Sequence, residues 1–236
     1  FAGASTDGNT SSVGTVFNEI FESGTATGDM ATVMSTLLGM GSSEEVSKAM
    51  ETMMPDMSSG ALNASRELTG QFMGSISNRL GYRRSGLSGV ATGDMFQGTG
   101  FWIQGLGSHV KQDARKGIEG YQANVFGTSI GVDQLIDRNW RAGLAGGYGY
   151  ANVNSKAPGS PSDSIHGMNV ALYGSYDSID LCESRNQRIQ TKDKEKLLDR
   201  DGAWYVDGMF GFAQNYYDSR REIWLTPTAA RVAKAD

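Results

Sequence analysis

What the sequence lacks narrows the classes of protein that it can encode. Cys182 is the only cysteine, which excludes an intrachain disulfide and a cysteine-bound metal cluster. No apolar run reaches the roughly 20 residues that a membrane-spanning helix needs. The 21 Lys and Arg residues are outnumbered by 26 Asp and Glu. They form no basic stripe that could neutralise phosphates, so nucleic acid is not an expected partner.

The chain also opens on Phe1 without a basic and apolar leader. We therefore expect any secretion signal to lie upstream, and the chain to be a piece of a longer precursor. Glycine, by contrast, is abundant, with 32 residues, while hydrophobic residues make up only 39%. This composition permits a transmembrane β-barrel, because half of each barrel strand faces water.

Residues 1–57 are predicted to be a linker with short helices. Residues 1–28 are rich in Gly, Ser, Thr and Ala, which is typical of a linker or of the frayed end of an upstream domain. Asp29 can cap a first short helix. Ser42 and Glu45 form a capping box for a second one.

Residues 58–82 are predicted to form a separate plug segment. Its helix should begin near Ser58 or Ser59 and end at about Leu80, before Gly81. Four apolar residues recur every four positions and form one narrow stripe, namely Leu68, Phe72, Ile76 and Leu80. The opposite face is broad and polar, with the side chains of Arg66, Glu67, Gln71, Ser75, Asn78 and Arg79. Such a helix could lie on a soluble core or stand inside a water-lined channel.

Over residues 99–236 the pattern changes to period 2, which predicts five antiparallel strands and the start of a sixth. One face of these strands is apolar. The other carries glycines and the polar residues Asp133, Arg141, Asn169, Tyr173 and Asp207. A dry sandwich core would not tolerate such charges unpaired, whereas a water-filled lumen tolerates them. The fold class predicted is therefore mainly β, an antiparallel transmembrane barrel.

Aromatic residues concentrate near the ends of the predicted strands. Membrane barrels place such rings at the two lipid–water interfaces. The residues predicted for this role are Trp140, Tyr148, Tyr150, Tyr176 and Trp204. An ordinary soluble β-sandwich core is the alternative interpretation of the same rings.

The connections between strands also differ in length. A few residues around 137–139 join the second and third strands, whereas the long polar run 154–165 separates the third from the fourth. Alternating short turns and long loops are typical of a barrel whose turns face the periplasm and whose loops face outward. By that alternation the next connection should be short, but it is the charged segment 180–202.

No enzymatic activity, cofactor or metal is predicted. The segment GTSIG at 127–131 matches the Gly-x-Ser-x-Gly pattern of hydrolase nucleophile elbows. It lies inside an unbroken strand pattern rather than at a strand-to-helix turn, so we interpret it as a chance match. His109 and His166 are the two histidines, and nothing in the sequence supplies further metal ligands for them.

The long helix reads SSGALNASRELTGQFMGSISNRL, rich in Ala, Ser, Arg and Leu, and it ends in Arg-Leu just before the first strand. The strand segments that follow read GFWIQGLGS, GTSIGVDQLIDRNWRAGLAGGYGYANV, MNVALYGSYDS and AWYVDGMFGFAQNYYDSRREI. In their order and spacing across residues 60–223, these segments resemble the C-terminal translocator domain of autotransporters. Those bacterial proteins carry an N-terminal passenger to the cell surface.

The resemblance implies a non-catalytic, twelve-stranded barrel in the outer membrane of a Gram-negative bacterium, with the helix running through its pore. It implies that the polar helix face from Arg66 to Arg79 faces the lumen. Charge pairs from Arg66 or Arg79 to Asp133 or Asp207 are therefore predicted. The partners implied are outer-membrane lipids, the chain's own N-terminal passenger, the barrel assembly machinery and periplasmic chaperones.

Two departures from the family pattern shape these expectations. Only 5–6 of the 12 strands are present, so the chain is expected to be truncated before its last strands. Residues 181–201 have no counterpart in a family turn and are predicted to be an unusual charged insertion. Two other functions stay open: a passive outer-membrane pore or adhesin anchor, and a soluble β-sandwich binding module.

Overall fold

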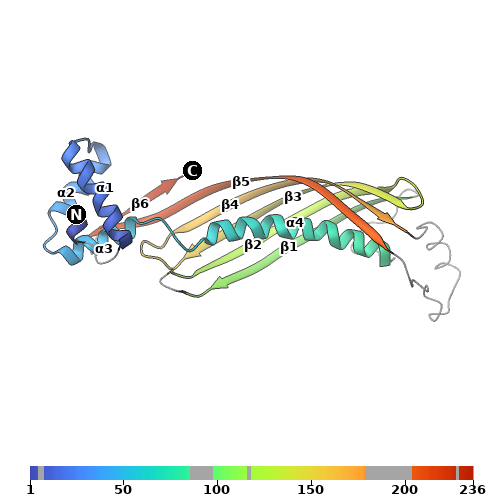
Figure 1. Cartoon of the computed structure of the whole chain (residues 1–236), viewed down its shortest axis with the longest axis horizontal. Helices are drawn as coiled ribbons and strands as arrows, with labels where there is room; N and C mark the ends of the chain where they lie inside the picture. The colour runs from blue at the N-terminus through green and yellow to red at the C-terminus, as the bar shows by residue number, and fades with distance from the viewer. Residues whose placement is uncertain (5–7, 86–97, 116–117, 179–203, 227–228, 236) are drawn as a thin grey trace.

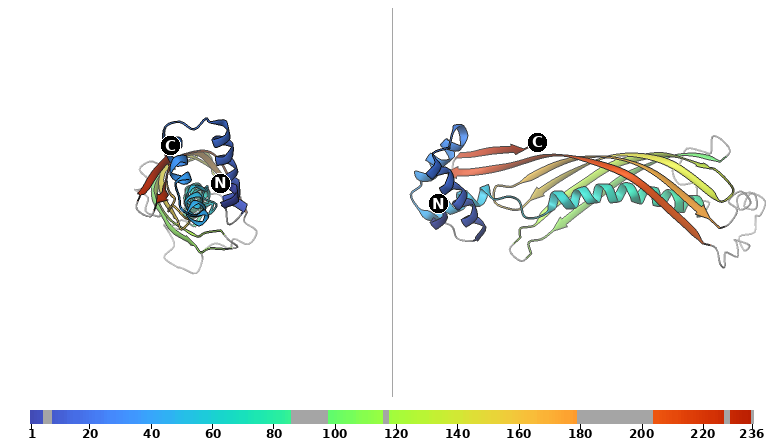
Figure 2. Two further views of the ribbon diagram at one scale, coloured as in Figure 1. Left: turned by 90° about the vertical axis from the view of Figure 1, so that its left-hand side faces the viewer. Right: turned by 45° about the horizontal axis from the view of Figure 1, so that its top comes forward.

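The computed structural model describes residues 1–4, 8–85, 98–115, 118–178, 204–226 and 229–235. Within these residues, four α-helices precede a six-stranded antiparallel sheet. Three short helices gather at one end, and a long curved sheet carries the fourth helix along its concave face (Figure 1). The end-on view in Figure 2 shows the sheet curving around that helix.

The strands follow each other in the sheet in chain order, and each pairs with its sequence neighbours. Their bounds are Thr99–Gln112 (β1), Tyr121–Leu135 (β2), Trp140–Ser155 (β3), Ser162–Asp177 (β4), Tyr205–Thr226 (β5) and Ala229–Ala235 (β6). The sheet is open, with β1 and β6 at its edges. The predicted insertion at 181–201, which contains Cys182, lies outside the described residues.

The sheet has two rims. The turn rim contains the connection 136–139 and the beginning of β1, and the loop rim contains the end of β1, the beginning of β2 and the connection 156–161. The long loop predicted over residues 154–165 is wrong, because the pairing of β3 with β4 continues to Asn154 and Ser162. Polar side chains at alternating positions are compatible with a strand, so the polarity of this run did not mark a loop.

The N-terminal module consists of η1 (Ala2–Ala4), α1 (Gly8–Ser23), α2 (Gly28–Leu38) and α3 (Ser43–Met53). It has an apolar core of its own, formed by Phe17, Met34, Leu37, Val46, Ala49 and Met50. The linker predicted over residues 1–28 is wrong for residues 8–23, which form α1. Val13, Phe17 and Ile20 recur there at helical spacing and pack on this core.

The caps of the short helices agree with the sequence in one case and differ in the other. Ser42 caps α3, since its Oγ accepts a hydrogen bond from the Glu45 backbone N–H at 3.2 Å. At α2 the N-cap position belongs to Thr27 and not to Asp29. Asp29 lies in the first turn of the helix, where its negative charge is favourable to the helix dipole.

The long helix α4 (Gly60–Ser85) continues past the end that the sequence predicted. A glycine inside a helix costs about 1 kcal/mol relative to alanine, and Gly81 was therefore expected near the terminus. The ion pairs of Arg83 and Arg84, which lie beyond Gly81, offset this cost.

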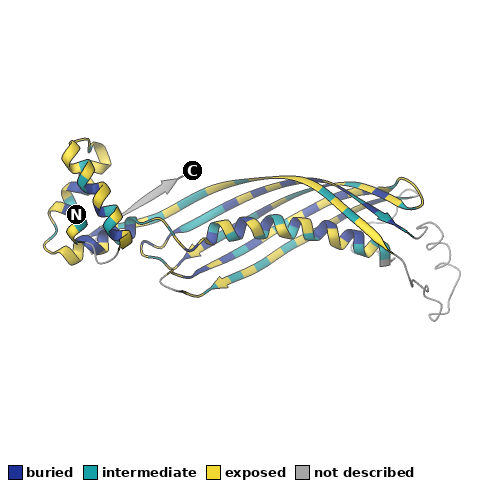
Figure 3. Cartoon of the chain, in the orientation of Figure 1, coloured by how far each residue is buried: buried dark blue, intermediate teal, exposed yellow. Residues whose placement is uncertain are grey.

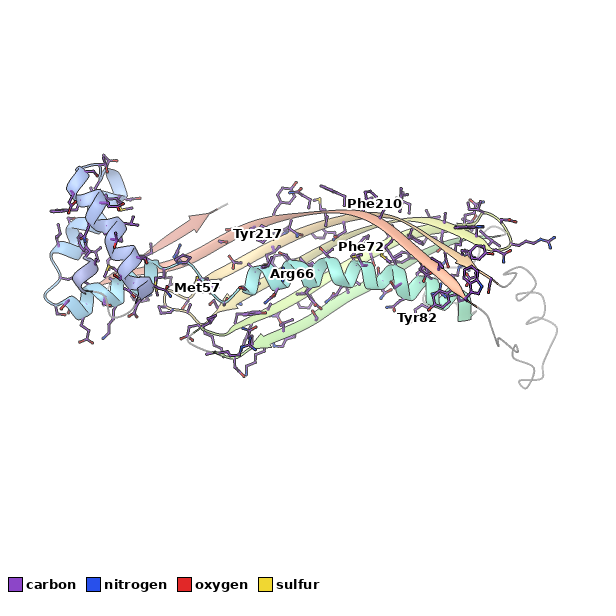
Figure 4. The ribbon with its side chains drawn as sticks, viewed as in Figure 1. Met57, Arg66, Phe72, Tyr82, Phe210 and Tyr217 are labelled. Carbon is purple, nitrogen blue, oxygen red and sulfur yellow. The ribbon has the colours of Figure 1, made fainter. Side chains whose placement is uncertain are left out.

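Burial alternates along the strands with a period of two (Figure 3). The buried positions face α4. The convex face exposes large apolar side chains, among them Phe126, Ile130, Val132, Leu144, Val170, Leu172, Phe210 and Phe212. Phe210 is 81% exposed and projects from β5 away from α4 (Figure 4). A β-sandwich would bury such a face under a second layer.

Candidate functional site

The apolar stripe of α4 lies directly on glycines of the concave face. Leu68 and Phe72 are both buried. A Cβ atom added at Gly147 would lie 2.5 Å from Cδ2 of Phe72, and one added at Gly149 would overlap Leu68. The glycines of β3 therefore allow the helix to approach the strand closely, which a larger side chain at either position would prevent.

Glycines also make room for two buried aromatic side chains of the sheet. Trp102 on β1 donates a hydrogen bond from Nε1 to the hydroxyl of Tyr173 on β4 at 2.8 Å. A Cβ atom at Gly131 would lie 2.5 Å from the Trp102 ring, and one at Gly143 would overlap the Tyr173 ring. The sequence does not mark Trp102 as a buried residue, because its neighbours Phe101 and Ile103 are bulky too and hide the alternation.

Neutral hydrogen bonds join the middle of α4 to the first two strands. The Ser129 hydroxyl on β2 donates to Oγ of Ser75 at 2.8 Å, and both residues are buried. Gln71 Nε2 donates to Oγ of Ser108 on β1 at 2.7 Å. Ser129, the centre of the GTSIG segment, thus contacts the helix from within a strand and not from a strand-to-helix turn.

At the turn rim, three arginines converge on one carboxylate. Asp133 is 1% exposed. It accepts hydrogen bonds from Arg79 Nε and Arg141 Nη1 at 2.7 Å each, and from Arg83 Nε at 3.3 Å. The Tyr173 hydroxyl donates to the same carboxylate at 3.3 Å. The predicted Arg79–Asp133 pair is therefore present, and it ties the last turns of α4 to β2.

A second ion pair ties the end of α4 to β5. Both terminal nitrogens of Arg84 donate to the Asp207 carboxylate, at 2.6 and 2.8 Å. The guanidinium carbon of Arg84, Cζ, lies 3.9 Å from the centre of the Tyr205 ring. The sequence predicted pairs from Arg66 or Arg79 to Asp133 or Asp207; the Arg79–Asp133 pair is present, whereas Asp207 pairs with Arg84. Arg84 takes that place because α4 extends past Gly81.

The polar face predicted for α4 divides into two parts. Gln71, Ser75 and Arg79 contact the strands as described above. Arg66 and Asn78 are exposed, and Glu67 accepts a hydrogen bond from Gln71 on the same helix at 2.9 Å. The strand residues that the sequence predicted to face a lumen lie on the concave side of the sheet, namely Asp133, Arg141, Asn169, Tyr173 and Asp207.

One aromatic group lies on the convex face near the turn rim. The Trp140 ring centre lies 5.0 Å from that of Tyr176, which lies 5.2 Å from that of Trp204. These rings come from the start of β3, the end of β4 and the residue before β5. Two strands and the residue before a third thus place aromatic side chains at one level.

A second aromatic group lies further along β3 toward the loop rim. Tyr148 and Tyr150 flank His166 of β4. The Tyr148 hydroxyl is 2.7 Å from Nδ1 of His166, and the Tyr150 ring centre is 5.0 Å from that of His166. Because β3 runs on to Ser155, this group lies in the middle of the strand and not at its end.

In the part of the chain that the structure describes, no group of three or more His, Cys, Asp and Glu side chains is placed to hold a metal ion. No helix there is both long and apolar enough to cross a membrane.

A model of the autotransporter β-domain family matches residues 101–236, more than half of the chain, and the chain therefore belongs to this family. β-Domains of this family serve as outer-membrane translocators and are typically non-catalytic. The chain is also similar to outer membrane protein B of Rickettsia prowazekii (strain Madrid E), with 26% identity over 189 residues. That alignment covers 65% of this chain and only 11% of the relative. No solved structure matches the chain.

Proposed function

We propose that this chain is the part of an autotransporter that anchors and secretes its N-terminal passenger, with α4 as a plug in the pore. The observation that carries the proposal is the distribution of side chains on the sheet, with apolar ones exposed and charged ones buried. Its convex face exposes apolar side chains such as Leu172 and Phe210, while its concave face buries Asp133 and Arg141. This arrangement suits a wall between lipid and a polar lumen, and it argues against a soluble β-sandwich.

The spacing of the two aromatic groups supports a membrane-crossing wall. Tyr150 follows Trp140 by ten positions on β3. Ten residues span about 34 Å along a strand. For a strand tilted by about 40°, this corresponds to about 26 Å along the membrane normal, close to the height of the apolar band of outer-membrane barrels. We therefore assign both groups to the lipid–water interfaces.

The proposed orientation puts the loop rim and the N-terminal module at the cell surface and the turn rim in the periplasm. The family resemblance supports it, because α4 then leads inward from the passenger to the first strand.

In hydrocarbon, the unpaired backbone groups of β1 and β6 would cost several kcal/mol each. A working barrel therefore needs further strands that pair with these two edges. Its partners are lipids, the passenger, the barrel assembly machinery and periplasmic chaperones.

The membrane location can be tested on the full-length protein in a Gram-negative host. Outer-membrane fractionation should recover it in the membrane pellet, and unheated samples should migrate differently from boiled ones, because a closed barrel resists detergent. A soluble protein without this heat-dependent shift would contradict the barrel.

The plug can be tested separately by channel recordings in planar bilayers. Deletion of residues 60–80 from the full-length protein should raise the conductance several-fold, because the helix fills the lumen. Arg79→Gln should increase the frequency of openings, since it removes a contact to Asp133. The exposed Arg66 offers the matched control, as Arg66→Gln leaves the described contacts between helix and strands intact. Unchanged conductance in the deletion variant would refute the plug.

A further inference from the structure

We infer that the N-terminal module is a cap on the loop rim that retains α4 in the lumen, and that Arg221 of β5 is its anchoring residue. The inference rests on the proposed function, because a cap on the rim has meaning only if α4 occupies a pore. It assigns to residues 1–53 a role different from that of a linker between passenger and barrel.

The anchor is possible because β5 is longer than its neighbours. β5 has 22 residues, whereas β1 to β4 have 14 to 16. The pairing of β5 with β4 ends at Arg220, which lies opposite Ser162, the first residue of β4. Arg221 is thus the first residue of β5 beyond β4. From there the strand runs toward the module (Figure 1).

Arg221 binds the carboxyl end of α3. Its Nη1 donates to the backbone carbonyls of Met53 and Met54 at 2.7 and 2.6 Å. These are the last residue of the helix and its C-cap. The final carbonyls of a helix have no partner within the helix, and they carry the negative end of its dipole. The Arg221 guanidinium, 167 residues after Met54 in the chain, pairs with these carbonyls and places a positive charge at the negative end of the dipole.

Thr52 makes a second connection between α3 and β5. Its hydroxyl donates to the carbonyl of Ala49 at 2.7 Å and accepts from the backbone N–H of Trp224 at 3.2 Å. The connection 156–161 joins the same contact, since Glu222 N donates to the carbonyl of Gly159 at 2.8 Å. Gly159 has a φ of 81° and lies against Thr52. Module, loop and strand therefore form one joint.

The segment between α3 and α4 is held at this rim as well. Asp56 accepts hydrogen bonds from the Ser155 hydroxyl at the end of β3, at 3.1 Å, and from the backbone N–H of Ser58, at 2.9 Å. Met57 lies between the module and α4 (Figure 4) and is exposed. This short segment therefore connects the joint to the start of α4 and is itself tied to the sheet, so the joint adds to the ion pairs that hold the other end of α4.

The joint can be tested in the full-length protein in the outer membrane of intact cells. Arg221→Gln removes the anchor from the strand side, and Thr52→Val removes the second connection from the module side. External proteinase K should cleave residues 54–59 of both variants about tenfold faster, the effect expected for losing a part-buried hydrogen bond to a charged or backbone group. The same variants should open more often in planar bilayers. Arg221→Lys, which keeps the charge, should restore part of the protection.

Arg220→Gln is the matched control. Arg220 neighbours Arg221 but is exposed, and it pairs with Asp218 at 3.4 Å. The inference is overturned if Arg221→Gln and Thr52→Val show the same cleavage rate and the same frequency of channel openings as Arg220→Gln. If Arg221→Gln does not assemble, Thr52→Val decides alone. Failure of the proposed function is distinct, since the wild-type protein itself would then show no heat-dependent shift in mobility.

Discussion

The N-terminal module and the sheet distribute their apolar side chains in opposite ways. The module buries Phe17, Leu37 and Met50 among its three helices. The sheet exposes Phe210 and Leu172 on its convex face. The same chain therefore follows the rule for a water-soluble domain in its first part and the reverse of that rule in its second part.

This contrast identifies the surroundings of each region. Hydrophobic burial stabilises a fold by removing apolar area from water, so large apolar side chains spread over one whole face indicate that water is not the neighbour there. The concave face shows the complementary feature, since its charged side chains are buried and paired with one another. Asp133 has four donors from three elements, as a buried carboxylate must.

The largest expected effect comes from breaking the polar interior. Asp133→Ala leaves three arginines without their shared carboxylate and should lower the free energy of unfolding in phospholipid vesicles by about 3–5 kcal/mol. Urea titration followed by tryptophan fluorescence measures it. Asp218→Ala is the control, because its exposed pair with Arg220 should contribute about 0–1 kcal/mol. Equal effects of both variants would mean that the concave cluster is solvated.

The second prediction compares two leucines of similar exposure. Leu172 on the convex face is 62% exposed, and Leu38 on the module is 57% exposed. Leu172→Arg should cost about 2–4 kcal/mol in vesicles if lipid covers that face. Leu38→Arg, facing water, should stay within about 0.5 kcal/mol of the wild type. The contrast between the two regions collapses if the same urea titration gives both variants equal stability.

The third prediction concerns the glycines beneath α4. Gly147→Val would force its side chain into Phe72 and should destabilise the protein by about 1–3 kcal/mol. Gly146→Val is its neighbour on the convex face, where an added Cβ meets nothing closer than 3.9 Å. Thermal unfolding of both variants should separate them, and a Gly147→Val protein as stable as Gly146→Val would show that α4 does not press on β3.

The smallest effect is expected in the module. Ser42→Ala removes the hydroxyl that accepts from Glu45 N and should cost about 1 kcal/mol. Hydrogen exchange should report faster exchange in α3 and no change in β2 and β3, because the two regions have separate cores. Ser43→Ala, one position inside the helix, is the control. Equal acceleration in the strands would contradict the separation.

Much of the sheet was predictable from local pattern. Alternation alone assigned Ser129, Asp133 and Arg141 to one face and Phe126 and Leu144 to the other, because successive strand residues point to opposite sides. The register places them accordingly. The capping role of Ser42 was equally local, since it depends on residues three positions apart.

The errors arose where distant contacts outweigh local preference. Helix propensity alone places the end of α4 at Gly81. The ion pair between Arg84 and Asp207, which are 123 positions apart in the chain, stabilises one further turn. The helix α1 was missed although Val13, Phe17 and Ile20 recur there at helical spacing, because Gly, Ser and Thr fill many of the other positions. The run 154–165 looked like a loop because polarity by itself does not distinguish a loop from a strand that extends beyond an apolar band.

The sequence by itself determined the period of each segment, the two faces of every strand and the family to which the chain belongs. These depend on spacing along the chain, which backbone geometry converts directly into direction. Only the tertiary structure decided that Arg79, Arg83 and Arg141 share one carboxylate, and that Arg221 closes the end of α3. Such partners are set by the register of paired strands and by the position of a helix on them, and no local pattern encodes either.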